Sequence, residues 1–98
     1  YIKSMATENP KVFMMVAAGK ALDYKKRNPD AHSNEVIQHI VEDVDALGHV
    51  KISAIAAADR AIKYKDQNPK MPDKDIMQRI MDEAVEILET LEEYKKHY

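Results

Sequence analysis

The sequence predicts an all-α domain of two tandem αα-hairpins that form a four-helix bundle with pseudo-two-fold symmetry. The first observation behind this prediction is a 40-residue internal repeat: residues 11–43 align with residues 51–83 without a gap and share ten identities. The second is the spacing of apolar residues, which follows steps of three and four as in amphipathic helices. The third is the scarcity of glycine, with only Gly19 and Gly48 in 98 residues.

The first helix is predicted to run from about residue 10 to residue 27. Asn9 is a favourable N-cap, and Pro10 stands at the first helical position, where its missing N–H removes no hydrogen bond. Asn28-Pro29 ends the helix, because proline disfavours the α conformation in the residue before it and cannot continue the ladder. The stripe predicted to face the core consists of Val12, Met15, Val16, Gly19 and Leu22.

The second helix is predicted to begin after Ser33 and to end at Gly48. Serine is a favourable N-cap, and glycine readily adopts the left-handed conformation found where helices end. The apolar seam of this helix contains Val36, Ile37, Ile40, Val41, Val44 and Leu47.

The third helix repeats the first and is predicted to end at Asn68-Pro69. Its apolar face contains Ile52, Ile55, Ala56 and Ile62. The fourth helix is predicted over residues 74–96 with Asp73 as its N-cap, which aligns with Ser33 in the first copy.

The fourth helix is longer than its counterpart, which leaves apolar side chains without cover. At a rise of 1.5 Å per residue it is about 34 Å long, against about 21 Å for the second helix. The uncovered residues define a predicted interaction surface: Leu88, Leu91, Tyr94 and Tyr98. A second copy of the chain, or the N-terminal residues Tyr1, Ile2 and Met5, would cover this surface.

The length predicts a single domain, residues 1–98, with repeat one at about 10–48 and repeat two at about 50–98. No apolar run approaches the ~20 residues of a membrane span, so we expect no membrane association. Cysteine is absent, which excludes disulfides and thiolate metal sites, and no signal-peptide pattern precedes the first helix; we expect a cytoplasmic location. The net charge of −2 argues against a constitutive nucleic-acid binder.

One short string, Arg27-Asn28 followed by His32, resembles the catalytic motif of HEPN ribonucleases, small helical domains that dimerise and cleave RNA. With neighbouring lysines it defines an alternative nucleic-acid site: Lys25, Lys26, Arg27 and His32. Here the string lies in the turn made by Asn28-Pro29 rather than in a helix. In the second repeat the residue aligned with His32 is Pro72, so the histidine of the motif is missing there. Asn28 also has a structural explanation, because both copies keep it.

Other chemistry has little support in the residues. Glu35, His39 and Glu42 share one helical face, but the aligned position of His39 is Arg79, so we predict solvated ion pairs there rather than a metal site. The sequence has no Gly-rich phosphate loop and no serine with evident histidine and acid partners. No cofactor, metal or catalytic residue is therefore predicted.

Asp59 falls on the apolar stripe of the third helix, where the first helix has Gly19. It is either a buried acid with a shifted pKa, which would mark a site, or, as we favour, a residue that lies at the edge of the stripe or pairs with Lys20 or Lys63.

These observations together predict a non-enzymatic protein-interaction or assembly module that self-associates through its fourth helix. Its partner would be another protein or a second copy of the chain, and nucleic-acid binding or cleavage at the turn is the alternative. Features kept in both copies are most economically structural. A site is therefore expected where the copies differ, as at Arg27, His32, the Gly19/Asp59 pair and the end of the fourth helix.

Overall fold

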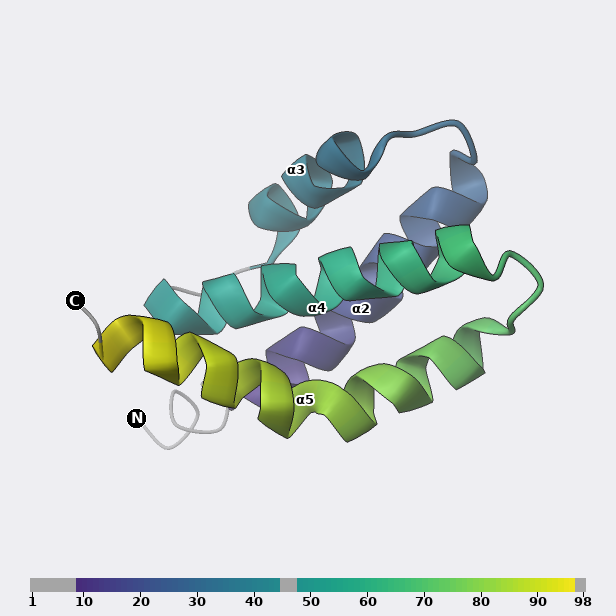
Figure 1. Ribbon diagram of the computed structural model, residues 1–98. Coiled ribbons are helices and arrows are strands. Elements are labelled where there is room, and N and C mark those ends of the chain that lie inside the picture. The colour runs from purple at the N-terminus through teal and green to yellow at the C-terminus, as the bar shows by residue number, and fades with distance from the viewer. Residues whose placement is uncertain (1–8, 45–47, 97–98) are drawn as a thin grey trace.

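Four helices form the part of the chain that this computed structural model describes, residues 9–44 and 48–96, with the side chains of residues 49 and 92–96 left undescribed. They are α2 (Pro10–Arg27), α3 (Ser33–Asp43), α4 (Gly48–Gln67) and α5 (Asp73–Lys96) (Figure 1). These residues contain no strand. The all-α class and the four helices are thus confirmed, and the Cα radius of gyration, 13.4 Å, is close to the ~13 Å of a compact domain of 100 residues.

Helix α2 has the predicted boundaries because local signals fix both of its ends. The side chain of Asn9 accepts a hydrogen bond from the backbone N–H of Lys11 at 3.0 Å, and Pro10 is the first helical residue. At the other end the backbone N–H of Asn28 donates to the carbonyl of Tyr24 at 2.9 Å. The capping signals in the sequence were sufficient here.

Helix α3 is shorter than predicted and starts one residue earlier. The carbonyl of His32 accepts from the backbone N–H of Val36 at 3.1 Å, so Ser33 is the first helical residue and not the cap; His32 holds the N-cap position without a side-chain hydrogen bond. The helix ends at Asp43, because Val44 is extended and buries its side chain in the core. Gly48 does have a positive φ of 60°, but it begins α4.

The predicted N-cap of α5 is likewise its first helical residue. The carbonyl of Pro72 accepts from the backbone N–H of Ile76 at 3.2 Å, which starts the helical ladder at Asp73. The carboxylate of Asp73 instead binds the ammonium of Lys65 at 3.0 Å and so connects α5 to the end of α4.

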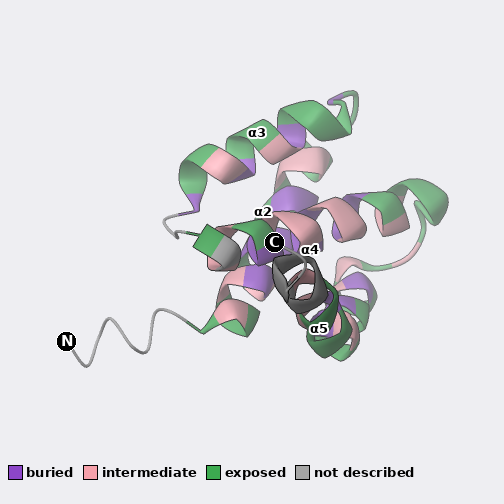
Figure 2. Ribbon diagram, turned by 60° about the vertical axis from the view of Figure 1, so that its left-hand side comes forward, coloured by how far each residue is buried: buried purple, intermediate pink, exposed green. Residues whose placement is uncertain are grey.

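The helices lie in three layers, with α2 and α4 crossing at the centre, α3 on one side and α5 on the other (Figures 1 and 2). The central helices have small residues at buried positions. Ala17 and Ala18 of α2 and Ala57 and Ala58 of α4 are all fully buried. Small side chains let the backbones of α2 and α4 approach each other closely. The closely packed pair then has two free faces, one against α3 and one against α5.

Each outer helix covers its own apolar cluster. The first cluster, beneath α3, contains Ala17, Ala21, Ala31, Val36, Ile40, Val44, Ala54, Ala58 and Ile62. The second cluster, beneath α5, contains Met14, Ala18, Leu22, Ala57, Ala61, Ile76, Ile80, Ala84 and Ile87. The central helices therefore contribute to both.

The predicted core stripes of the central helices were partly wrong. Val12, Val16 and Ile52 are exposed by 50%, 44% and 55%, whereas Met14 and the alanines of α2 are fully buried. The prediction counted large apolar residues, but helices at the centre of a layered fold bury two faces and use small residues to do so. Gly19 and Leu22 of the predicted stripe do lie against α5 or its cluster.

Candidate functional site

The two Asn-Pro turns are held by the same backbone hydrogen bonds. Asn28 and Asn68 donate to the carbonyls of Tyr24 and Tyr64 at 2.9 Å, and their own carbonyls accept from residues 31 and 71 at 2.9 Å. A lysine closes each turn: the ammonium of Lys25 donates to the carbonyl of Ala31 at 2.6 Å, and that of Lys65 to the carbonyl of Met71 at 3.0 Å.

The predicted nucleic-acid residues do not all face one site. Lys25 is half-buried and is used to close its turn. Arg27 forms an ion pair with Asp23 at 3.2 Å along the same helix. Lys26 and His32 are exposed. Of the four residues, only Arg27 lines the pocket described below.

The predicted interaction surface on α5 is partly covered. Leu88 and Leu91 are half-buried and pack against the second cluster. The side chain of Tyr94, and Tyr98 altogether, lie outside the described residues. The role of this surface stays a prediction.

Four exposed apolar side chains lie on the two contacting helices α2 and α5. We define the apolar strip as Val12 and Val16 of α2, exposed by 50% and 44%, and Met81 and Val85 of α5, exposed by 55% and 49%. The two helices contact each other and cross at an oblique angle (Figure 1). The methyl group of Met77 would lie 3.6 Å from a Cβ placed at Gly19. The sequence missed the strip because Val12 and Val16 were assigned to the core.

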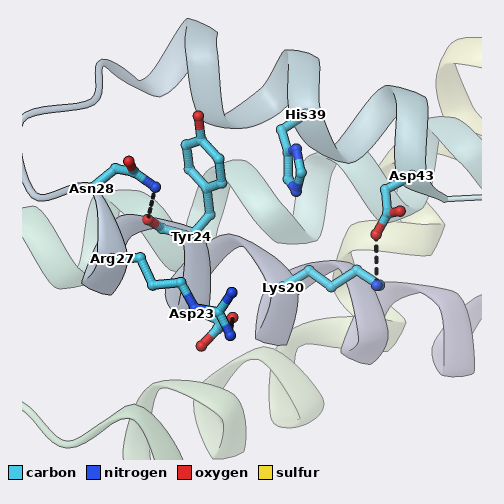
Figure 3. A pocket seen from close by; sticks show the side chains of 7 residues that line it. All are labelled: Lys20, Asp23, Tyr24, Arg27, Asn28, His39 and Asp43. Atoms are coloured by element: carbon cyan, nitrogen blue, oxygen red, sulfur yellow. Dashed lines mark hydrogen bonds and ion pairs between the residues drawn. The ribbon is translucent and has the colours of Figure 1, made fainter.

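A polar pocket of about 330 Å³ opens between α2 and α3 (Figure 3). It is lined by Lys20, Asp23, Tyr24, Arg27, Asn28, His39 and Asp43. The ammonium of Lys20 pairs with the carboxylate of Asp43 at 2.6 Å. The rings of Tyr24 and His39 stack with centroids 4.5 Å apart and planes inclined by 28°. The pocket thus combines two ion pairs with a wall of two stacked rings.

The residues 40 positions further on form a closed polar network between α4 and α5. Arg60 binds the carboxylate of Glu83 at 2.9 Å, and the hydroxyl of Tyr64 donates to the same carboxylate at 2.7 Å. The guanidinium of Arg79 lies 5.3 Å from the centre of the Tyr64 ring, a cation–π arrangement. These side chains contact one another directly. In the first copy the aligned Lys20, Asp43 and His39 are different side chains, and the hydroxyl of Tyr24 donates to Glu35 instead, at 3.1 Å.

The local charges shift several pKa values. The hydrogen bond to Glu83 raises the pKa of the Tyr64 hydroxyl, and the hydrogen bond to Glu35 raises the pKa of Tyr24. Partial burial acts to raise the pKa of the Glu83 carboxyl, but the hydrogen bonds from Tyr64 and Arg60 outweigh it and leave that pKa lowered. The hydrogen bond from Lys20 lowers the pKa of Asp43.

The remaining candidates contact neighbouring side chains within the described residues. Asp59 pairs with Lys63 at 3.0 Å, in agreement with the interpretation that we favoured. Glu35 and His39 both contact Tyr24, and Glu42 accepts from Gln38 at 3.2 Å. Within residues 9–44 and 48–96, no group of three His, Asp or Glu side chains is arranged to hold a metal ion.

No helix in the described part of the chain has the length and apolar character needed to cross a bilayer. The cytoplasmic location stays a prediction. No protein-family model matches the sequence, and comparisons with curated proteins and with solved structures found no match.

Proposed function

We propose that this chain is a non-enzymatic protein-interaction module that self-associates through α5, with the apolar strip at the centre of the interface. The observation that carries the proposal is the exposure of four large apolar side chains on two adjoining helices. Single exposed apolar residues are ordinary, but a group of them on one surface is typical of interaction sites. Leu88, Leu91 and Tyr94 of the predicted surface belong to the same helix, so this surface would extend the interface toward the C-terminal end of α5; Tyr98 lies outside the described residues.

Charge favours a second copy of the chain as the partner. Helix α2 has five basic and one acidic side chain, which gives +4, and α5 has four basic and eight acidic side chains, which gives −4. In a two-fold dimer the strip of one copy faces the strip of the other, so α2 of each copy can lie against α5 of its partner. Opposite charges then meet twice around an apolar centre.

The proposal includes internal duplication with pseudo-two-fold symmetry of the two hairpins. It is supported by the composition of the clusters: a shift of 40 residues converts Ala17, Ala21, Val36, Ile40 and Val44 of the first into Ala57, Ala61, Ile76, Ile80 and Ala84 of the second. The opposite shift converts Ala54, Ala58 and Ile62 into Met14, Ala18 and Leu22. The matching Asn-Pro turns support the same interpretation.

Light scattering coupled to size exclusion tests self-association. We expect the wild-type chain to elute as a dimer at high micromolar concentration and Met81→Lys to elute as a monomer, because the dimer would bury an unpaired ammonium. Ile52→Lys is a matched control, since Ile52 is as exposed as Met81, at 55%, but lies on α4 outside the strip. The proposal would be contradicted if the wild-type chain were a monomer, or if Met81→Lys and Ile52→Lys dissociated the dimer equally.

Nucleic-acid binding is the alternative outcome. A gel shift with single-stranded RNA at low salt measures it directly, with Arg27→Ala as the diagnostic variant. If the chain binds RNA in a salt-sensitive way and Arg27→Ala abolishes this binding, the proposed protein-interaction function is wrong and the RNA-binding function implied by the HEPN-like string is favoured.

A further inference from the structure

The polar pocket differs from the aligned region in the second copy at five of its seven lining positions. Lys20 stands for Arg60, Asp43 for Glu83 and His39 for Arg79, and Asp23 and Arg27 stand for Lys63 and Gln67. In the second copy the longer carboxylate side chain accepts hydrogen bonds from both the arginine and the tyrosine. In the first copy Asp43 binds Lys20, Tyr24 binds Glu35, and a cavity of about 330 Å³ lies between the side chains.

The charges around the pocket select the chemistry of a ligand. Two cations, Lys20 and Arg27, face two carboxylates, Asp23 and Asp43, so the formal charge of the four groups is zero. A simple anion would meet the two aspartates, and a simple cation would meet the lysine and the arginine. A ligand with one charge of each sign can satisfy both kinds of group.

The order of the charges adds a geometric condition. Lys20 is paired with Asp43, and Asp23 is paired with Arg27. Lys20 and Asp23 lie three residues apart, on the same side of α2, and both side chains line the cavity (Figure 3). A ligand carboxylate beside Lys20 and a ligand ammonium beside Asp23 would complete a row of alternating charges without breaking either existing pair.

We propose that the polar pocket binds a small zwitterion of the α-amino-acid class. Lys20 holds its carboxylate, Asp23 holds its ammonium group, and its side chain packs against the stacked rings of Tyr24 and His39. The cavity volume is near the lower end of ligand pockets and fits a molecule of this size. The pocket is open to solvent, so the expected dissociation constant is in the millimolar range, on the order of 1–10 mM.

Titration of the ¹⁵N-labelled full chain, followed by NMR, tests the proposal with three matched probes: L-valine, isovalerate and isobutylammonium. We expect saturable shifts of amides around the pocket with L-valine, and binding at least about tenfold weaker with either singly charged analogue. Lys20→Met and Asp23→Asn should each weaken L-valine binding about tenfold. Lys11→Met, which changes an exposed lysine of α2 outside the pocket, should leave it unchanged. No saturable shift with L-valine, or equal binding of isovalerate, would overturn the proposal.

A second variant tests whether the pocket itself is the site. The triple substitution Lys20→Arg, His39→Arg and Asp43→Glu installs the larger Arg60, Arg79 and Glu83 of the second copy, which lie against Tyr64 or one another there, and it leaves Asp23 and Arg27 in place. We expect a folded chain with the wild-type circular dichroism spectrum and no L-valine binding. Binding retained by the triple variant would refute the assignment. Met81→Lys should bind L-valine as the wild type does, which separates this proposal from the one on self-association.

Discussion

Tyr24 and Tyr64 occupy aligned positions at the ends of α2 and α4, yet their hydroxyls have different partners. The hydroxyl of Tyr64 shares the carboxylate of Glu83 with Arg60, whereas that of Tyr24 donates to the exposed Glu35. Asp43 is one methylene shorter than the aligned Glu83, and among the described residues its ion pair is with Lys20. The difference between a closed polar network and an open pocket therefore depends on a few changes in side-chain length and type.

The network around Glu83 should make the free energy of unfolding depend on pH. The pKa of this carboxyl is lowered in the folded chain. Its stabilising contribution is thus fully present above the unfolded pKa of about 4.3 and is lost as the pH falls through the folded pKa. We expect Glu83→Gln to lower the free energy of unfolding by about 1–2 kcal/mol at pH 7, and the difference from wild type to shrink as the pH falls from about 5 to 3.

Urea denaturation across this pH range measures the effect, with Glu89→Gln as the control because Glu89 is an exposed glutamate on the same helix. A constant difference between wild type and Glu83→Gln at all pH values would show that the ionised carboxylate is not the stabilising form.

The central helices depend on small side chains at their crossing. Ala57 of α4 is fully buried, and the aligned Ala17 of α2 is buried as well. We expect Ala57→Leu to destabilise the domain by about 1–3 kcal/mol, because the added volume must separate two closely packed helices. The same change at the half-buried Ala56, one residue earlier, should cost clearly less. Chemical denaturation measures both; equal losses would mean that the crossing is not tightly packed.

Element boundaries show where sequence reasoning works and where it stops. Both ends of α2 were predicted correctly because they depend on local interactions. Asn9, Pro10 and Asn28 start or end the helix through contacts with residues only a few positions away in the sequence. The end of α3 was not, because Val44 leaves the helix and is buried in the first cluster, a tertiary effect that Gly48 does not signal. The apolar strip was missed for a related reason. Val12 and Val16 have the spacing of core residues, but their side chains are exposed on the surface of α2.

The pocket was only partly predictable. The sequence indicated that a site would lie where the copies differ, and Arg27 was among the residues named for that reason. It could not place Lys20, His39 and Asp43 around one cavity, because they come from two helices whose relative position depends on the packing of the whole domain.

At the scale of the whole molecule, the two clusters lie on opposite sides of the central pair. Ile40 is fully buried in the first cluster and the aligned Ile80 in the second. We expect Ile40→Val and Ile80→Val each to lower the free energy of unfolding by about 0.5–1.5 kcal/mol. In the double variant the two losses should add to within about 0.5 kcal/mol, because the residues have separate neighbours. Denaturation of the four proteins completes this cycle, and a coupling above about 1 kcal/mol would mean that the clusters behave as one core.

The sharing of α2 and α4 between both clusters constrains how the chain can fold as it leaves the ribosome. Once residues through Val44 have emerged, α2 and α3 are present, but the first cluster still lacks Ala54, Ala58 and Ile62 of α4. The leading half therefore cannot complete its own core, and it must wait for at least 18 further residues. The second cluster in turn needs Ile76, Ile80, Ala84 and Ile87 of α5, so the two cores can be completed only when helices of both halves are present.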